Sequence, residues 1–235
     1  MKIEIVTTPN EKLKETGFGS RYACHCVLQS LLNANHQAVV TVCVDAVDLA
    51  AVINRKPDLI IGVVKYILLE NGQHLWLSEY FENENVTYTG STRQTLSYDS
   101  NKVSAKQKVA SKNIDTAEFF TATPYEYLDE QSLPLAFPLF VKPIDAANGN
   151  GVDVNSLVHN FEGFQHKVQH LYDQYAEPAL VEEYLDGREF TVAVIEDGEE
   201  LIIAAIEIIS PEEDGIRILG TKVKTENTET LHTIN

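Results

Sequence analysis

The sequence predicts an α/β protein with a parallel, doubly wound sheet in its first part and an α+β region in its second part. Short apolar runs alternate with helical patterns over residues 1–92, and this order is typical of βαβ units. The second part ends in two long apolar runs joined by a short turn, which favours antiparallel strands. All apolar runs are far shorter than the ~20 residues that a membrane span needs.

The elements of the first part follow from the spacing of apolar residues. Residues 2–7 alternate apolar and polar side chains as a strand does, and residues 22–33 carry apolar side chains at helical spacing. The runs 38–44 and 59–64 are rich in β-branched residues, and both indicate buried strands. Shorter elements complete this part, with helices at 48–54 and 74–83 and a strand at 86–89.

The second part begins with a polar, lysine-rich segment. Residues 100–111 indicate an exposed helix, with Asp99 or Ser100 as its N-cap. Asp197 and Gly198 separate the last two long apolar runs and are a strong hairpin signal. The remaining elements are a helix at 161–172 and strands at 139–142, 152–154, 179–184, 190–195, 201–209 and 216–223.

The charge and the cysteines restrict the partners. The chain has 18 basic and 35 acidic residues and a formal net charge of −17, so we expect neither nucleic acid nor a membrane surface as a partner. Three cysteines, Cys24, Cys26 and Cys43, are too few for a disulfide framework and fit a reducing cytosol. Cys24 and Cys26 are closer in sequence than common zinc ligands, and we interpret them as buried helix residues. Without a secretory signal, a soluble, cytoplasmic protein is expected.

A lysine-bearing strand followed by a glycine loop is the first candidate site. Lys142 lies in the strand Phe-Val-Lys-Pro, where it presents a fixed positive charge near the strand end. The loop that follows consists of Asn148, Gly149, Asn150 and Gly151, and its amides can fold over phosphate groups. A plain hairpin turn with an exposed lysine explains this pattern equally well.

An acidic segment between two apolar strands is the second candidate. Glu182 and Glu183 lie at one strand end, and Glu189 enters the next strand. Carboxylates at such positions can accept hydrogen bonds from an amine or from ribose hydroxyls, and a solvated turn is the alternative. Lys102, on the polar helix, is a weak candidate when it is taken alone.

The order of these segments resembles the ATP-grasp superfamily, and the closest group is the D-alanine–D-alanine ligases. The resemblance is carried, in order, by Tyr-Thr-Gly-Ser at 88–91, the helix with Lys102, the Lys142 strand, the glycine loop and the acidic segment 181–192. It implies a Rossmann-like substrate-side domain over 1–92. It also implies a central ATP-grasp subdomain over 93–179 and a partial C-terminal subdomain over 180–235, so that the ATP-grasp α+β domain looks incomplete at its C-terminus.

The resemblance also implies a role for each candidate residue on the phosphate side of ATP. Lys102 and Lys142 would approach the α- and β-phosphates, and the loop 148–151 would close over the triphosphate. Lys222 would contact the γ-phosphate. Lys224 is the alternative, because the segment 220–224 can be shifted in its alignment with the family.

On the nucleoside side, Glu182 would take the adenine amine, and Glu183, Tyr184 and Leu185 would offer backbone contacts to the ring. Glu189 would accept hydrogen bonds from the ribose hydroxyls.

In the family that the chain resembles, a carboxylate attacks the γ-phosphate of ATP, and an amine then attacks the acylphosphate. Mg²⁺ bridges the phosphates, and its ligands are expected outside this chain. The expected partners are small molecules, namely amino acids with D-alanine among them, and a homodimer is left open. The resemblance implies an acidic residue in the loop that follows the first strand, but here this loop reads Gly-Phe-Gly-Ser-Arg over residues 17–21, so other amino acids or small acids remain alternatives. A non-catalytic ATP-binding module is a further alternative.

Overall fold

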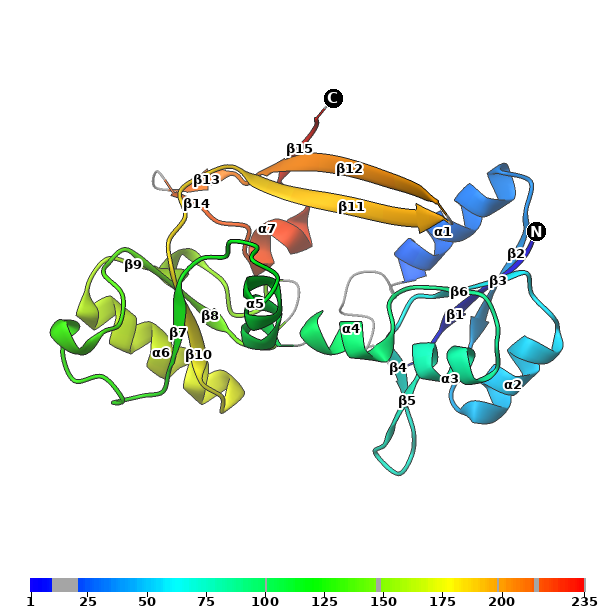
Figure 1. Ribbon diagram of the computed structural model, residues 1–235, viewed down its shortest axis with the longest axis horizontal. Coiled ribbons are helices and arrows are strands. Elements are labelled where there is room, and N and C mark those ends of the chain that lie inside the picture. The colour runs from blue at the N-terminus through cyan, green and yellow to red at the C-terminus, as the bar shows by residue number, and fades with distance from the viewer. Residues whose placement is uncertain (10–20, 100, 147–148, 198, 214–215, 235) are drawn as a thin grey trace. The chain divides into compact units, whose positions relative to one another are not determined.

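The computed structural model describes residues 1–9, 21–99, 101–146, 149–197, 199–213 and 216–234. The chain divides into two compact units, Met1–Asp99 and Ser100–Asn235. Each unit has its own sheets (Figure 1). Each unit also has its own hydrophobic core. No helix in the described ranges is both long and apolar enough to cross a membrane.

The first unit is built on a four-stranded parallel sheet. Its strand order is β2-β1-β3-β6, and every neighbouring pair runs parallel. The strands are β1 (Lys2–Thr7), β2 (Gln37–Val42), β3 (Leu59–Gly62) and β6 (Tyr88–Thr89). The main connecting helices are α1 (Arg21–Asn33), α2 (Ala46–Asn54) and α3 (Leu77–Asn83). The expected doubly wound sheet is therefore confirmed.

Helices cover both faces of this sheet. Ile5 belongs to a core cluster with Cys24 of α1, whereas Val6 belongs to a second cluster with Leu49 of α2 and Phe81 of α3. Successive residues of a strand point to opposite faces, so α1 lies on one face, and α2 and α3 lie on the other. Figure 1 shows this arrangement.

Two expectations for the first unit are wrong. The run 38–44 was expected as a buried strand, but Val39, Val40 and Val42 are exposed because β2 is an edge strand with β1 as its neighbour. The expected helix 74–83 begins only at Leu77, because 74–76 form strand β5 (His74–Trp76). Strand β5 pairs with β4 (Tyr66–Leu68), and the Tyr66 ring stacks on His74 with centroids 4.0 Å apart.

Helix α4 (Arg93–Asp99) closes the first unit. The Arg93 guanidinium bonds Glu79 at 2.8 Å and lies over the Trp76 ring, and Asp99 forms an ion pair with Lys65. These contacts explain why the unit extends to Asp99, beyond the boundary at residue 92 that the sequence suggests.

The second unit opens with helix α5 and an antiparallel sheet. Helix α5 (Lys102–Ala110) is capped by Asn101, whose side chain accepts from the Ser104 amide at 2.8 Å. The cap is therefore Asn101 and not Asp99, and Ser100, the other predicted cap, lies outside the described residues. The sheet has the order β7-β10-β8-β9. Its strands are β7 (Phe119–Ala122), β8 (Leu139–Pro143), β9 (Leu157–Val158) and β10 (Ala179–Glu183).

Helix α6 (Phe161–Tyr175) packs on this sheet and completes the core of the second unit. Phe164, Val168 and Leu171 of α6 are buried against Val141 and Val181 of the strands. Strand β10 lies between β7 and β8, so the division suggested at residue 180 falls inside this sheet.

A second antiparallel sheet follows, with the order β11-β12-β15. Its strands are β11 (Glu189–Asp197), β12 (Glu200–Ile209) and β15 (Thr230–Thr233). The β11–β12 pairing confirms the predicted hairpin. The expected strand 216–223 is wrong, because the segment divides into β14 (Ile216–Arg217), which pairs with β13 (Glu212–Glu213), and helix α7 (Thr221–Glu226).

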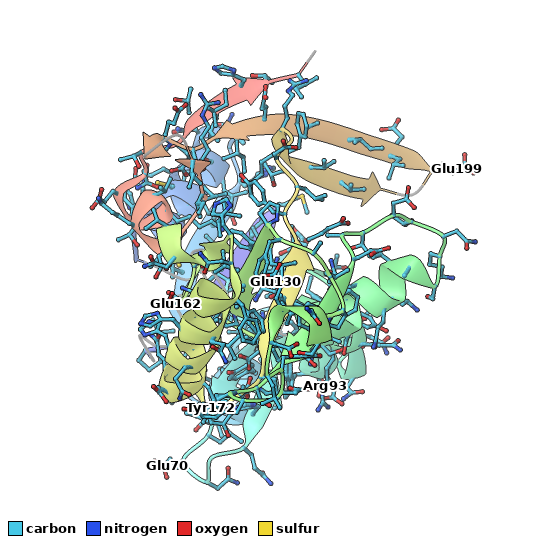
Figure 2. All side chains as sticks on the ribbon, turned by 90° about the vertical axis from the view of Figure 1, so that its left-hand side faces the viewer. Glu70, Arg93, Glu130, Glu162, Tyr172 and Glu199 are labelled. Carbon is cyan, nitrogen blue, oxygen red and sulfur yellow. The ribbon has the colours of Figure 1, made fainter. Side chains whose placement is uncertain are left out.

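Within the described part of the second unit, two short 3-10 helices lie in the connections. They are η2 (Glu130–Ser132) and η3 (Val154–Ser156). The expected strand 152–154 is wrong, because Asp153 caps η3 instead. Glu70, Glu130 and Glu162, labelled in Figure 2, are exposed acidic residues that contribute to the formal charge of −17, whereas Glu4 and Glu182 are buried.

Candidate functional site

A buried carboxylate between two lysines forms the centre of the candidate site in the second unit. Glu182, at the end of β10, is only 8% exposed. Its carboxylate lies 2.7 Å from the Nζ atom of Lys106 on α5 and also forms an ion pair with Lys142 on β8. Three segments far apart in the sequence therefore meet at one carboxylate. Two cations and one anion leave an excess positive charge, and such a site favours an anionic ligand.

Lys106 is the residue of this cluster that the sequence prediction missed. It is buried, and its Nζ atom also donates to Oγ1 of Thr116 at 2.8 Å. The expectation of a wholly exposed helix at 100–111 is wrong at this position. The available signal was the spacing from Lys102, because residues four apart share one face of a helix.

Lys102 lies near the glycine loop. Its ammonium group donates to the carbonyl oxygens of Pro143, Ile144 and Ala146, at 3.1, 3.2 and 2.7 Å. It therefore fixes the chain as it leaves β8 and enters the loop, one turn of α5 away from Lys106.

The glycine loop has a backbone that requires glycine at two positions. Gly149 and Gly151 have φ values of 75° and 76°, which side chains other than glycine rarely adopt. A Cβ atom on Gly151 would lie 2.5 Å from Cγ of Pro143. The carbonyl oxygen of Gly149 accepts from Oγ1 of Thr221 at 2.6 Å, which joins the loop to α7. Asn150 lies between these glycines, and Asn148 is outside the described residues.

Helix α7 carries both candidate γ-phosphate lysines, Lys222 and Lys224, and both are exposed. Partial burial raises the pKa of the Glu189 carboxyl, and the positive charges of Lys224 and Lys142 act against this rise. Lys142, Lys224 and Glu189 therefore share one electrostatic environment.

The segment after Glu182 is held between neighbouring strands. The Glu183 amide donates to the Glu118 carbonyl at 3.0 Å, and the Glu183 side chain accepts from the Glu118 amide at 2.9 Å. The Tyr184 amide donates to the Pro138 carbonyl at 3.2 Å, and its ring stacks on Phe140. Leu185 follows and is exposed. The amides of Glu183 and Tyr184 already donate to carbonyl oxygens of the protein. A ligand at this segment would therefore contact Leu185 more readily than these two amides.

A second buried lysine, Lys167, lies near the end of the glycine loop. The sequence prediction missed this residue as well. It is 2% exposed within α6, and its Nζ atom lies 2.9 Å from Oδ1 of Asp153. Asp153 caps η3 just after the loop, so this ion pair anchors the end of the loop on the core. The sequence signal was a lysine among the apolar positions Phe164, Val168 and Leu171.

The residues that the structure describes include His, Cys, Asp and Glu, which are the side-chain types that ligate metal ions. Within these ranges, no three side chains of His, Cys, Asp or Glu gather closely enough to hold a metal ion. Cys24 and Cys43 are buried, whereas Cys26 is exposed, so the expectation of a buried Cys26 is wrong.

The second unit combines a four-stranded and a three-stranded antiparallel sheet, a glycine loop and a lysine–glutamate cluster, which is the arrangement expected of an ATP-grasp protein. A protein-family model described as D-ala D-ala ligase C-terminus matches residues 108–233, which is more than half of the chain. The chain therefore belongs to the D-alanine–D-alanine ligase family.

Individual relatives agree with this assignment. The D-alanine–D-alanine ligase of Hydrogenovibrio crunogenus is 32% identical over 114 residues, which cover 48% of this chain and 35% of that protein. That of Lacticaseibacillus casei is 29% identical over 126 residues, which cover 54% of this chain and 33% of the relative. The chain thus spans about a third of the length of these curated relatives.

Solved structures show the same fold over the whole chain. The D-alanine–D-alanine ligase of Bacillus anthracis complexed with ATP has a TM-score of 0.64 and 18% identity, and the match covers 100% of this chain and 71% of that one. A second structure of the same enzyme has a TM-score of 0.67 at 18% identity, over 100% and 72% of the two chains.

Proposed function

We propose that this chain binds ATP in its second unit and belongs to an ATP-dependent carboxylate–amine ligase that resembles D-alanine–D-alanine ligase. The observation that carries the proposal is the buried Glu182 with Lys106 and Lys142 on either side. The family membership and the ATP complex of the Bacillus anthracis relative support it. The reacting acid and amine would be small molecules, with D-alanine as the first candidate, and the product would serve cell-wall synthesis.

The charges of the site suit a triphosphate. Lys142 and Lys106 supply two cations for one carboxylate, and Lys102 holds the loop that follows β8. The amides of Gly149 and Gly151 would fold over the phosphates, because glycine permits the close approach of a backbone to a ligand. Lys224, with Lys222 as the alternative, would meet the γ-phosphate.

The nucleoside end would lie along the acidic segment. Glu182 would accept from the adenine amine, and Leu185 would offer its backbone to the ring, beside Glu183 and Tyr184. Glu189 would accept hydrogen bonds from the ribose hydroxyls. Desolvation raises the pKa of this carboxyl, and the positive charges of Lys224 and Lys142 oppose the rise.

The chemistry of such a ligase is mostly positioning and charge neutralisation. A substrate carboxylate would attack the γ-phosphorus, ADP would leave, and an amine would then displace phosphate from the acylphosphate. The glycine loop would exclude water, which otherwise hydrolyses that intermediate. Mg²⁺ would supply further neutralisation of the phosphate charge, with ligands outside the described residues.

Calorimetry with ATP tests the nucleotide site directly. Lys142→Met should weaken ATP binding by about tenfold or more, since a charged hydrogen bond is worth about 1.5–3 kcal/mol. The matched control is Lys112→Met, because Lys112 is an exposed lysine just beyond α5. Equal ATP affinity in the wild type and in Lys142→Met would remove this cluster from the site.

Turnover is measured separately as ADP release with ATP, Mg²⁺ and a panel of amino acids. Release that depends on D-alanine supports the specific ligase, and release with a different amino acid or small acid reassigns the substrate. ATP binding without turnover under any of these conditions would identify a non-catalytic ATP-binding module.

A further inference from the structure

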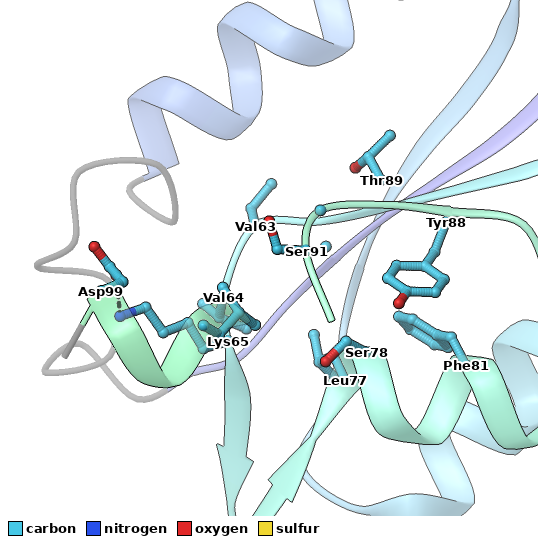
Figure 3. A pocket seen from close by; sticks show the side chains of 13 residues that line it. Val63, Val64, Lys65, Leu77, Ser78, Phe81, Tyr88, Thr89, Ser91 and Asp99 are labelled. Atoms are coloured by element: carbon cyan, nitrogen blue, oxygen red, sulfur yellow. Dashed lines mark ion pairs between the residues drawn. The ribbon is translucent and has the colours of Figure 1, made fainter. Parts of the chain in front are cut away.

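The parallel sheet of the first unit has two edges, which differ in length and in surroundings. At one edge, β6 contributes only Tyr88 and Thr89, and a cavity of about 210 Å³ lies beside them and beside Ser78 (Figure 3). At the other edge, β2 extends over six residues. An edge strand presents backbone N–H and C=O groups to which a further strand can bind. The edge at β2 is therefore the place where another polypeptide can extend this sheet.

The backbone groups of β2 alternate between the side that faces β1 and the outer side. The Gln37 amide donates to the Met1 carbonyl at 2.9 Å, and the Cys43 amide donates to the Thr7 carbonyl at 2.8 Å. In a parallel pair every second residue bonds to the same neighbour, so the odd-numbered residues of β2 face β1. The backbone groups of the even-numbered residues therefore point away from β1. These residues are Ala38, Val40 and Val42.

The neighbourhood of β2 is poor in charge and rich in exposed apolar side chains. Residues 22–54 contain two charged side chains, Asp45 and Asp48, although 23% of the whole chain is charged. Charged residues and proline are the features that usually keep edge strands apart, and β2 contains neither. Six apolar side chains at this edge are between 36% and 75% exposed, which is typical of a protein interface. They are Leu32, Val39, Val40, Val42, Val44 and Val47.

The outward groups of β2 are symmetric about Val40, so the strand is complementary to itself. When two copies of β2 run antiparallel with their Val40 residues opposite each other, Ala38 lies opposite Val42, and Val39 lies opposite Thr41. The outward N–H and C=O groups then meet in hydrogen-bonded pairs. Like charges opposite each other destabilise a pair of strands, and this register contains none. A two-fold axis also uses the same edge of both copies, so association ends at the dimer.

Helix α2 carries opposite charges at its two ends and runs antiparallel to β2. Its acidic N-terminal end lies just after β2, where the Asp48 carboxylate accepts from the Val44 amide at 2.8 Å. Its C-terminal end is followed by Arg55 and Lys56, and the Arg55 carbonyl accepts from the ammonium group of Lys2 at the start of the sheet. A two-fold axis through β2 turns the acidic end of one α2 toward the basic end of the other. This charge complementarity favours a second copy as the partner.

We propose that edge strand β2 pairs antiparallel with β2 of a second copy of this chain, about a two-fold axis at Val40, so that one continuous sheet crosses the dimer. Backbone hydrogen bonds along β2 and apolar contacts of Val39, Val42 and Val47 form the interface. Each copy has a net charge of −17, so a higher salt concentration, which screens the repulsion, strengthens the dimer. The proposal is independent of the proposed function, because β2 belongs to the first unit and the nucleotide would bind in the second.

Sedimentation velocity of the full chain over a range of concentrations is the first test. A monomer–dimer equilibrium is expected, with a dissociation constant on the order of 10 μM and no larger species. Val40→Glu should weaken the dimer by about tenfold or more, since it places two carboxylates opposite each other at the two-fold axis. Val194→Glu is the matched control, because it makes the same change of charge at an exposed valine of β11, an edge strand of the second unit. This control should dimerise as the wild type does.

Amide hydrogen exchange, measured by NMR, identifies the strand that pairs. The amides of Ala38, Val40 and Val42 should exchange more slowly above the dissociation constant than in dilute samples, because they gain hydrogen bonds only in the dimer. The amides of Val39 and Thr41 should change little, since they face β1 in both states. This alternation within one strand is not expected of a dimer that forms through another surface.

Val42→Pro is a second variant, which spares the fold of the monomer. The Val42 amide points away from β1, so proline costs the monomer little, and circular dichroism checks the fold of each variant. The dimer loses two hydrogen bonds, one for each copy, and should weaken by about tenfold. A chain that stays monomeric up to about 1 mM, or a dimer whose Val40 amide is not protected, would overturn the proposal. Loss of the dimer in Val194→Glu but not in Val40→Glu would also overturn it and would assign the association to β11.

Discussion

The Nζ atom of Lys106 lies 2.7 Å from a carboxylate oxygen of Glu182, inside the second unit. Both side chains are about nine-tenths buried, and Lys142 pairs with the same carboxylate. A phosphate chain beside these two lysines would gain favourable charge–charge interactions with both of them.

Lys106→Met should therefore lower ATP affinity by about tenfold, since it removes one cation but keeps most of the volume of the side chain. The same substitution leaves Glu182 paired with Lys142, so the fold should persist. Calorimetry with ATP gives the affinity, and Lys112→Met serves again as the exposed control. An affinity drop equal to that of the control would place Lys106 in a purely structural role.

Glu189→Gln should reduce the preference for ATP over its 2′,3′-dideoxy analogue. A carboxylate accepts hydrogen bonds from both ribose hydroxyls more strongly than an amide does. The ratio of the two dissociation constants is the measurement, taken for wild type and variant. Glu200→Gln, at an exposed carboxylate on the neighbouring strand β12, is the control. A ratio that stays the same in Glu189→Gln contradicts the ribose contact.

The ionisation of Glu189 gives this preference a pH dependence. Because burial raises its pKa, the carboxyl takes up a proton at a higher pH than an ordinary glutamate. The preference should therefore decline as the pH falls toward the raised pKa and be complete well above it. Glu189→Gln should show no such decline.

Gly151→Ala should disrupt the glycine loop. Its φ of 76° disfavours alanine, and the added Cβ would meet Pro143 at 2.5 Å. Gly72→Ala is a matched control, because Gly72 has a φ of 80° and open space around it. Gly72→Ala should cost about 1 kcal/mol of unfolding free energy, and Gly151→Ala should cost clearly more. Urea unfolding measures the loss of unfolding free energy in both variants. Equal losses would show that Pro143 moves away from the added Cβ atom without a large energetic penalty.

The ion pair of Glu4 and Arg55 should make the first unit sensitive to acid. Glu4 is 1% exposed, and Arg55 donates to its carboxylate at 2.7 and 2.9 Å while Thr41 donates at 2.6 Å. Burial alone would raise the pKa of Glu4, but these hydrogen bonds outweigh burial and lower it. The resulting stabilisation is present above the pKa of the unfolded chain and is lost as the pH falls through the lower folded value.

Arg55→Met should remove about 1–3 kcal/mol of stability at neutral pH, since it leaves a buried carboxylate with fewer donors. It should also move the acid loss of stability to higher pH. Arg93→Met is the matched control, because Arg93 and Glu79 form a pair of similar length with both side chains half exposed. The measurement is the unfolding midpoint of each variant at a series of acidic pH values. The same loss of stability in Arg55→Met and Arg93→Met would contradict the prediction.

Local patterns were sufficient to predict most of the elements near the site. The strand that holds Lys142 and the helix α6 were each predicted from residues within one element, and the β11–β12 hairpin was predicted from two adjacent apolar runs and the short turn between them. The predictions were wrong where a neighbouring strand determines the exposure or the conformation of a segment. Strand β2 is exposed because it forms a sheet edge, and residues 74–76 form a strand because Tyr66 pairs with Trp76.

The sequence by itself determined the class of this protein, because the order of the lysine strand, glycine loop and acidic segment is a property of the chain. Only the tertiary structure decided that Lys106 and Lys142 share Glu182, that Lys167 anchors the loop, and that a cavity forms beside Ser78. Periodicity reflects interactions within a few residues, whereas ion pairs and cavities depend on how distant segments pack.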